Sequence, residues 1–272
     1  MVRDRFAEQT RPVVFAYLSR FRRKEPAAAP TVGTRLVYAV GDIHGRADLL
    51  SHLITTIIED ADILAPDATP ALVFLGDYVD RGPESRSVLD QVIALADCGL
   101  FEIRALKGNH EDALFSFLES AGFGATWEDF GGRETLMSYG VTPPRIGAPI
   151  EEWEQTRAAF DAALPREHRA FLSGLEMMAV YGDYAFVHAG VRPGVSLEKQ
   201  SERDLLWIRD DFLRAKGPFD KVIVHGHTPE PEPYLGRFRI GIDTGAYATG
   251  ALTAVRLSGT EQTILQATAA KD

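Results

Sequence analysis

The sequence predicts an α/β protein built around a parallel sheet, with a second sheet and an inserted helical segment. Between residues 36 and 119, an apolar strand, a polar loop and an amphipathic helix follow one another three times. Successive strands begin about 35 residues apart, close to the length of a βαβ unit, so these strands should be parallel. The repeat then breaks, and only short strands follow. A chain of 272 residues with 45% hydrophobic content can bury a full core, and a single domain is the simplest division.

The first half of the chain supplies the parallel strands and the helices that follow them. Strands are expected at residues 36–40, 71–75 and 103–106, and helices at residues 47–58, 84–96 and 111–119. Ligands of parallel sheets gather beyond the carboxyl ends of the strands, so we expect a functional site at this edge.

The second half of the chain departs from this repeat. Residues 120–176 are rich in glycine and proline and carry acidic stretches around Trp127 and Trp153. We interpret these residues as an inserted, partly helical cap that helps to choose the substrate; a purely structural excursion is the alternative. The elements expected after it are a hairpin at residues 177–187, a helix at 203–215, and strands at 221–224, 239–242, 252–257 and 262–266. The last three strands suggest a second sheet of mixed or antiparallel character.

The N-terminal segment differs in charge from the rest of the chain. Residues 1–24 carry seven basic and two acidic side chains, whereas the whole chain has a formal net charge of -10. Apolar residues at positions 14, 17, 18 and 21 recur at helical spacing and indicate a short amphipathic helix. It would dock on the body or, alternatively, attach to an anionic membrane surface. We therefore separate a basic segment and linker, residues 1–30, from the folded domain, residues 31–272.

The composition excludes several classes of partner. An acidic body disfavours nonspecific binding to nucleic acid. No stretch approaches the roughly 18 apolar residues that a membrane span needs, so no stable membrane insertion is expected. The lone Cys98 cannot form an internal disulfide, and its neighbours indicate a buried thiol, which fits a reducing compartment. A cytoplasmic protein is the simplest interpretation, and the sequence does not predict an oligomeric state.

Metal-binding and proton-transfer side chains follow the three parallel strands, at the points where the strands end. The clusters are Gly-Asp-Ile-His-Gly at residues 41–45, Gly-Asp-Tyr-Val-Asp-Arg-Gly at 76–82, and Gly-Asn-His-Glu at 108–111. Asp42 and His44 are two residues apart, so both side chains point the same way if the loop stays extended. His188 and His227 follow later apolar strands in the same manner.

These strand ends supply candidate ligands for a pair of divalent cations, namely Asp42, His44, Asp77, Asn109, His188 and His227. Mixed oxygen and nitrogen donors suit Mn, Fe or Zn better than Mg or Ca. Taken singly, each Asp or Asn is better explained as a helix cap, and each His as a structural residue. Capping does not predict a ligand at five strand ends, however, so we predict two divalent cations, with Mn favoured and Fe or Zn as alternatives.

The ordered motifs GDIHG, GDYVDRG, GNHE, HAG and HGHT resemble those of the calcineurin-like metallophosphoesterases, specifically the phosphoprotein phosphatase branch. The resemblance extends from about Leu36 to Leu257. It implies a two-sheet β-sandwich flanked by helices, with an inserted helical cap, and makes residues 31–272 a catalytic domain. It also implies that Asp42, His44 and Asp77 hold one metal, and that Asp77, Asn109, His188 and His227 hold the other.

Two departures from the family pattern are visible. Many relatives outside this branch have a further ligand histidine where this chain has Pro229, which favours the phosphoprotein phosphatase branch. Lys107 stands where many relatives carry arginine, a mild change.

The resemblance further implies that Arg209 holds the substrate phosphate beside Arg81. His225 is left outside the ligand set, where it would orient a ligand or face a neighbouring strand.

The chemistry expected of such a site is hydrolysis by in-line attack on phosphorus. Two cations about 3.5 to 4 Å apart would lower the pKa of a bridging water toward roughly 7 and so generate hydroxide. His110, paired with Asp80, would stay protonated and donate to the departing oxygen. Arg81 offers a forked donor to the phosphoryl oxygens, or alternatively forms only a surface salt bridge with Asp80 or Glu84.

The motifs alone do not select a substrate, because one such centre cleaves both monoesters and anhydrides. We favour a serine/threonine protein phosphatase, on the basis of Arg192-Pro193-Gly194 and the stretch from Trp207 to Arg209. Hydrolysis of diadenosine tetraphosphate or another nucleotide is the enzymatic alternative. An alternative of another class is a catalytically inactive scaffold that binds phosphoproteins, but no ligand or acid position is lost here.

Overall fold

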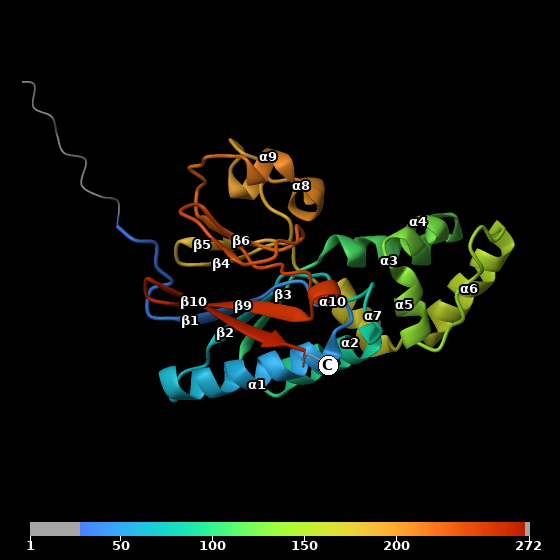
Figure 1. Ribbon diagram of the computed structural model, residues 1–272, viewed down its shortest axis with the longest axis horizontal. Coiled ribbons are helices and arrows are strands. Elements are labelled where there is room, and N and C mark those ends of the chain that lie inside the picture. The colour runs from blue at the N-terminus through green and yellow to red at the C-terminus, as the bar shows by residue number, and fades with distance from the viewer. Residues whose placement is uncertain (1–27, 270–272) are drawn as a thin grey trace, which may run out of the picture.

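The computed structural model describes residues 28–269, and two five-stranded sheets packed face to face form its centre (Figure 1). The first sheet has the order β10-β9-β1-β2-β3, with β1 at Leu36–Val40, β2 at Ala71–Phe74, β3 at Glu102–Ala105, β9 at Ala251–Ser258 and β10 at Glu261–Thr268. The second has the order β4-β5-β6-β8-β7, with β4 at Ala179–Tyr181, β5 at Tyr184–Phe186, β6 at Val222–His225, β8 at Arg239–Gly241 and β7 at Tyr234–Leu235.

The strand pairing confirms part of the predicted topology and corrects another part. β1, β2 and β3 are parallel neighbours, as the βαβ spacing predicts. The strands predicted at 252–257 and 262–266, however, are not in the second sheet. They form β9 and β10, which extend the first sheet by antiparallel pairing of β9 with β1. Local sequence pattern predicts each strand but not the edge to which it adds, since that depends on contacts between distant residues.

The alternation of side chains along each strand explains the layers. In β1, Val37 and Ala39 face the second sheet, whereas Tyr38 and Val40 face the helices on the other side. The second sheet repeats this arrangement, because Phe186 points toward the first sheet and Ala185 toward a separate helical layer. Strands buried on both faces read as continuous apolar runs, which is why they stood out in the sequence.

Helices cover the outer face of each sheet (Figure 1). The first sheet is covered by α1, Ala47–Leu64, and α2, Ser85–Asp97, and the second by α8, Glu202–Trp207, and α9, Asp210–Leu213. α3, Asn109–Glu119, leads into the inserted residues 120–176, which are mostly helical, with η1 at Ala121–Phe123, α4 at Gly124–Asp129, α5 at Gly132–Ser138, α6 at Ile150–Ala163 and α7 at Arg166–Ser173. The remaining short helices are η2, Leu197–Lys199, and α10, Ala246–Thr249.

The single helix predicted over residues 203–215 is wrong in one respect, because it breaks between α8 and α9. Ile208 is extended, with φ -65° and ψ 142°, and its side chain is buried beneath the second sheet. Arg209 follows with φ -131° and ψ -104° and stays exposed. An unbroken helix could not place these neighbouring side chains in such different surroundings.

Two further expectations have different outcomes. The amphipathic helix predicted near residues 14–21 lies outside the described residues. Cys98 is exposed, so the buried thiol predicted from its neighbours is wrong. The last fully buried residue of α2 is Val92, and Cys98 lies beyond it at the end of the helix. Within residues 28–269, no helix has the length and apolar character needed to cross a membrane.

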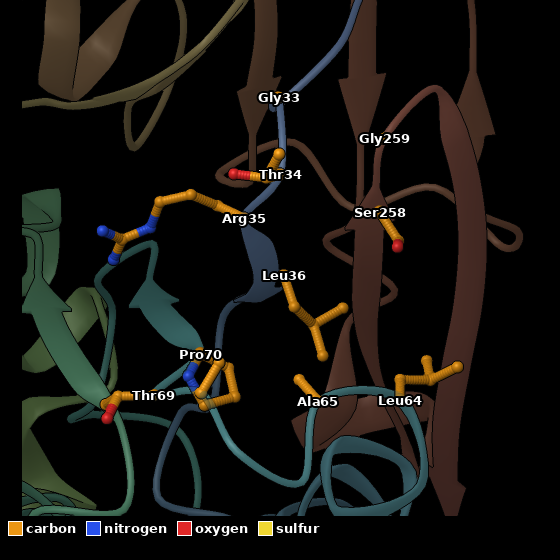
Figure 2. Close-up of a pocket in the computed structure, with 11 residues that line it drawn as sticks. Gly33, Thr34, Arg35, Leu36, Leu64, Ala65, Thr69, Pro70, Ser258 and Gly259 are labelled. Carbon is orange, nitrogen blue, oxygen red and sulfur yellow. The ribbon is translucent and has the colours of Figure 1, made fainter.

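A cavity of about 370 Å³ lies at the amino-terminal edge of the first sheet (Figure 2). Leu36 at the start of β1, Leu64 at the end of α1 and Pro70 before β2 line it. The polar clusters follow the carboxyl ends of the same strands, so this cavity is at the opposite edge of the sheet from the candidate site.

Candidate active site

The polar residues predicted from the strand ends come together in one buried site between the two sheets. The loops after β1, β2, β5 and β6 supply them, together with the first turn of α3. All have exposed fractions of 0–4%: Asp42, His44, Asp77, Asp80, Asn109, His110, His188 and His227. Groups of this polarity are rarely buried unless they pair with one another or with an ion.

The backbone of this site is strained. Within the described chain, the non-glycine residues with positive φ are His44, Asp77, Asp80, Arg81 and His227, at 47°, 54°, 71°, 68° and 67°. Each belongs to the predicted site. A non-glycine residue in this conformation costs on the order of 1–3 kcal/mol and persists only where its surroundings fix it. The loops therefore hold their side chains at a cost to stability, as is typical of functional sites.

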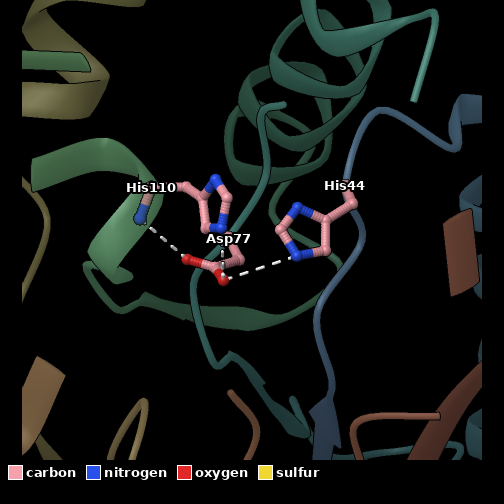
Figure 3. A group of neighbouring side chains, drawn as sticks. All are labelled: His44, Asp77 and His110. Atoms are coloured by element: carbon pink, nitrogen blue, oxygen red, sulfur yellow. Dashed lines mark hydrogen bonds and ion pairs between the residues drawn. The ribbon is translucent and has the colours of Figure 1, made fainter. Parts of the chain in front are cut away.

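Among residues 28–269 there are two possible metal-binding clusters, and Asp77 is the centre of the first (Figure 3). Its Oδ2 lies 3.5 Å from Nε2 of His44 and 3.8 Å from Nε2 of His110. The backbone N–H of His110 donates to the other carboxylate oxygen of Asp77, at 3.1 Å.

The second cluster joins Asp77 to His188 and His227. Nε2 of His188 lies 3.5 Å from Asp77 Oδ1 and 3.2 Å from Nδ1 of His227. Asn109 Oδ1 lies between the two histidines, 2.8 Å from His188 Nε2 and 2.7 Å from His227 Nδ1. Asp77 alone belongs to both clusters, and this arrangement is what a carboxylate shared by two cations requires.

The protonation of the histidines provides a test of whether a cation fits. Burial lowers the pKa of His44 to about 3 and that of His227 to about 2, and it also lowers the pKa of His188, so all three are neutral. His44 Nδ1 donates to Val79 O and His188 Nδ1 donates to Leu75 O, both at 2.9 Å. Each Nε2 therefore carries a lone pair, which is the form that binds metals.

Both lone pairs face acceptor oxygens, and that of His44 Nε2 also accepts a hydrogen bond from Arg81 Nη1. His188 Nε2 points at the amide oxygen of Asn109, and the two nitrogens facing Asp77 meet a carboxylate. Opposed lone pairs at such distances repel unless a cation lies between them. Two buried atoms, Asp42 Oδ1 and His227 Nε2, also lack a hydrogen-bond partner among the described residues. The residues present therefore fit divalent cations.

Asp42 stands slightly apart from both clusters. Its Oδ2 accepts a hydrogen bond from the backbone N–H of His227 at 2.9 Å, which joins the loop after β1 to the loop after β6. Its other oxygen, Oδ1, lies so close to Gly226 that a Cβ at residue 226 would approach this oxygen within 1.9 Å. Burial and the neighbouring carboxylate of Asp243 raise the pKa of Asp42 well above its usual range. A cation would relieve this repulsion.

His110 and Asp80 form the predicted pair, with 2.8 Å between Nδ1 and Oδ2. Burial alone would lower the pKa of His110, but the carboxylates of Asp77 and Asp80 outweigh it and raise the pKa above its usual value. His110 Nε2 faces the site, and its T-shaped contact with His44 has a centroid distance of 4.6 Å. The pair can therefore hold a proton beside the metal clusters.

The two predicted arginines occupy different places. Arg81 Nη1 donates to His44 Nε2 at 3.0 Å, and its guanidinium lies 4.8 Å from the ring centroid of Tyr247. The salt bridge to Asp80 or Glu84 considered from the sequence is absent among the described residues. Arg209 is exposed at the break after α8 and lines a cavity of about 610 Å³ with Trp207. Beyond the effect of burial, its charge further lowers the pKa of His188 and of His227.

His225 is close to the site without joining either cluster. Burial lowers its pKa to about 3, so its Nδ1 donates to Gly226 O at 3.0 Å and its Nε2 accepts from Arg239 on β8 at 3.3 Å. The contact with Arg239 confirms that His225 faces a neighbouring strand, and the orientation of a ligand by His225 stays a prediction.

Three functional residues were missed by the sequence analysis. The Glu111 carboxylate accepts hydrogen bonds at 2.9 Å from the backbone N–H groups of Gly108, Asp77 and Tyr78, and so ties two loops together. Asp243 follows β8 closely, and burial raises its pKa to about 6. The strand-end rule that found the ligands would have found Asp243 too. Tyr247, which packs on His44 and Arg81, gave no comparable signal.

Comparison with known proteins identifies the family. Residues 36–250 match the family model described as calcineurin-like phosphoesterase. This chain belongs to that family. It is therefore a metal-dependent phosphoester hydrolase, as the motifs and the two clusters indicate, which leaves the inactive scaffold without support.

Curated relatives of this phosphoesterase are named as nucleotide hydrolases. It is 28% identical over 236 residues to the asymmetrical bis(5'-nucleosyl)-tetraphosphatase PrpE of Anoxybacillus flavithermus, and 30% identical over 239 residues to that of Geobacillus thermodenitrificans. Each alignment covers 80% of this chain and 88% of the relative. A symmetrical bis(5'-nucleosyl)-tetraphosphatase of Acidovorax sp. is 32% identical over 163 residues, but this alignment covers 60% of this chain and 47% of that protein.

Solved structures share the fold of this phosphoesterase. A putative diadenosine tetraphosphatase superposes with a TM-score of 0.55 at 19% identity, over 88% of this chain and 99% of that one. A serine/threonine phosphatase from Saccharomyces cerevisiae superposes with a TM-score of 0.51 at 16% identity, over 88% and 81% of the two chains. These likenesses confirm the predicted two-sheet fold and do not separate the two candidate substrates.

Proposed function

We propose that this phosphoesterase hydrolyses dinucleoside tetraphosphates such as diadenosine tetraphosphate, with asymmetrical cleavage into a nucleoside triphosphate and a nucleoside monophosphate. The observation that carries the proposal is the extent of the likeness: the asymmetrical relatives align over 88% of their length, the symmetrical one over only 47%. The serine/threonine phosphatase favoured from the sequence stays the competing prediction.

In this proposal the ligands divide between two cations, with Asp42, His44 and Asp77 at one and Asp77, Asn109, His188 and His227 at the other. When bound, the cations would supply Lewis-acid activation of water and neutralise phosphate charge. The mixed oxygen and nitrogen donors support Mn, with Fe or Zn as alternatives. The tautomers of His44 and His188 and the shared Asp77 carboxylate support this division, because Nε2 of each of these two histidines presents a lone pair.

The chain's own residues would bind the phosphate chain and move the proton. We assign His110 as the acid that donates from Nε2 to the departing oxygen, with Asp80 holding its Nδ1. Arg81 would turn from His44 Nε2 to the phosphoryl oxygens once that nitrogen is engaged, since the Tyr247 ring supports its guanidinium. Arg209, exposed in the adjoining cavity, would bind a further phosphate group.

An aromatic shelf, formed by Phe130 and Trp207, supports a nucleotide substrate. The two rings lie 5.9 Å apart between centroids. Phe130 is 6.1 Å from the His110 ring, and Trp207, 36% exposed, is 6.3 Å from the His227 ring. The shelf therefore extends from the proposed acid to the second metal cluster. An exposed aromatic surface beside a phosphate-binding arginine is suited to stacking a nucleobase.

A direct comparison of substrates tests the proposed function. The purified protein loaded with Mn is expected to turn over diadenosine tetraphosphate with a kcat/KM at least about 10-fold above that for phosphoserine and phosphothreonine peptides, because only the nucleotide engages the aromatic shelf. The products should be ATP and AMP, separated by ion-exchange chromatography. A preference for the peptides would overturn the proposal in favour of the protein phosphatase, and two ADP molecules would overturn the asymmetrical cleavage.

A second prediction concerns the shelf itself. Trp207→Ala is expected to raise the KM for diadenosine tetraphosphate about 10-fold, since stacking of a base on an aromatic ring contributes about 1–3 kcal/mol. The KM for p-nitrophenyl phosphate, which has no base, should stay the same, and Trp207→Phe should recover most of the affinity. Equal changes for both substrates would show that Trp207 supports the site generally rather than binding a base.

A further inference from the structure

Asp80 has more hydrogen-bond partners than those that the sequence predicted, which were His110 and, as an alternative, Arg81. It is fully buried and sits at φ 71°. Its Oδ1 accepts a hydrogen bond from Thr135 Oγ1 at 2.6 Å, and its Oδ2 accepts one from Trp127 Nε1 at 3.0 Å, on the same oxygen that contacts His110. Its backbone N–H points to the Thr135 and Ser85 hydroxyl oxygens, at 2.9 and 3.1 Å.

The two side-chain donors come from the inserted residues rather than from the strand-end loops. Trp127 is on α4 and Thr135 is on α5. Between them, Gly131 accepts a hydrogen bond from the backbone N–H of Arg81 at 3.0 Å. Gly131 is at φ 98°, and a Cβ there would lie 2.7 Å from the Arg81 nitrogen. The segment from Trp127 to Thr135, which we call the clamp, thus wraps the turn that carries Asp80 and Arg81.

The clamp has little freedom to move. The Trp127 ring is fully buried and stacks on Phe117 of α3 at 4.7 Å, so it is packed on the same helix that carries His110 in its first turn. Gly132 leaves no gap, because a Cβ there would lie 2.4 Å from the Trp127 ring. The orientation of the indole N–H is therefore fixed by packing, and the orientation of the Asp80 carboxylate is fixed in turn.

We propose that Trp127 and Thr135 are positioning residues for protonation of the leaving group, acting through Asp80 on His110. A carboxylate held only by His110 could rotate and take the imidazole with it. Donors on both of its oxygens lock one rotamer, so His110 Nδ1 stays engaged and Nε2 stays aimed at the departing oxygen. This inference rests on the proposed acid role of His110, and it gives the inserted residues a part in catalysis in addition to the predicted choice of substrate.

The test compares substrates that need the acid with substrates that do not. Trp127→Phe and Thr135→Val remove the donors while keeping most of the volume. Each is expected to lower kcat for phenyl phosphate, a poor leaving group, about 10-fold, with much less effect on p-nitrophenyl phosphate and with KM unchanged. Thr135→Ser, which restores the hydroxyl, should recover kcat. A loss that is the same for both substrates would overturn the inference.

Matched controls come from the same inserted residues. Trp153→Phe changes another buried tryptophan that contacts Phe117. Thr156→Val removes a hydroxyl whose one hydrogen bond within residues 28–269 is to Glu152 O of its own helix. Neither should change the preference between the two leaving groups. Circular dichroism and metal content of every variant separate unfolding from a catalytic effect, and Thr135→Val keeps the test decisive if Trp127→Phe does not fold.

A double-mutant cycle shows whether the clamp acts through His110. In the His110→Asn background, Thr135→Val should cause no further loss on phenyl phosphate, because the group it positions is gone. Additive losses would overturn the inference. If His110→Asn alone lacks leaving-group selectivity, the acid role fails. If His110→Asn loses more kcat on phenyl phosphate than on p-nitrophenyl phosphate and the clamp variants lose equally on both, only the positioning inference fails.

Discussion

Asp77→Asn is expected to abolish most activity and to lower the metal content of the purified protein. Asp77 is the one described residue that belongs to both clusters, and its carboxylate is buried among three neutral histidine rings and His110. Asparagine keeps the shape of the Asp77 side chain but removes its negative charge. It also places an amide N–H₂ against the lone pairs of the neighbouring histidine nitrogens. Loss of about 4 kcal/mol of transition-state stabilisation corresponds to a fall in kcat on the order of 10³-fold.

The measurement pairs turnover of p-nitrophenyl phosphate with elemental analysis of metal per chain. A chelator should remove the wild-type activity to the same degree, and re-added Mn should restore it. Asp62→Asn, an exposed aspartate on α1, is the matched control and should leave both quantities unchanged. Full activity and full metal content in Asp77→Asn would show that the proposed centre is not the catalytic one.

The ligands could be predicted because the signal is local in sequence and geometric in origin. Parallel strands end at one edge of the sheet, so a polar residue directly after an apolar run is placed at that edge whatever the rest of the fold does. Asp42, Asp77 and His188 follow this rule, and the structure gathers them. Asp243 obeys it as well, since it directly follows the strand predicted at residues 239–242.

The contacts of the inserted residues could not be predicted in the same way. Trp127 and Thr135 reach Asp80 across 47 and 55 positions of sequence, and nothing in the spacing of those residues points to a carboxylate partner. Acidic and aromatic residues around them suggested a surface that chooses substrate. The choice of substrate by these residues stays a prediction. Trp127 itself is fully buried, because its ring stacks on Phe117 and its N–H is satisfied inside the core.

The same distinction explains the break at Arg209. The periodicity from 203 to 215 predicts a helix, and helical turns do form at both ends of it. The interruption depends on Ile208, which is buried beneath the second sheet and thereby forces Arg209 outward. A propensity pattern holds no information about that packing. The arginine was nonetheless assigned a functional role, through family resemblance rather than through the helix prediction.

His110→Asn is the second variant with a large expected effect, and its effect should depend on the substrate. Metals should still bind, because His110 is not one of the six proposed ligands and all six are untouched. Turnover should fall on the order of 10² to 10⁴-fold for phenyl phosphate, whose leaving group needs a proton, and much less for p-nitrophenyl phosphate. The structural reason is that His110 holds its proton between Asp80 and the site, with its pKa raised by two carboxylates despite burial.

The leaving-group dependence separates an acid from a residue that merely supports the site. A plot of log kcat against the pKa of the leaving phenol should be shallow for the wild type and steep for His110→Asn, since without the acid the departing oxygen carries its full negative charge. His52→Asn changes an exposed histidine on α1 and should leave the slope unaltered. Parallel lines for wild type and His110→Asn would contradict the acid role, because loss of an acid must make turnover depend more steeply on the leaving group. Loss of bound metal from the variant would also contradict it, because the lost activity would then trace to the metal ligands and not to a missing proton.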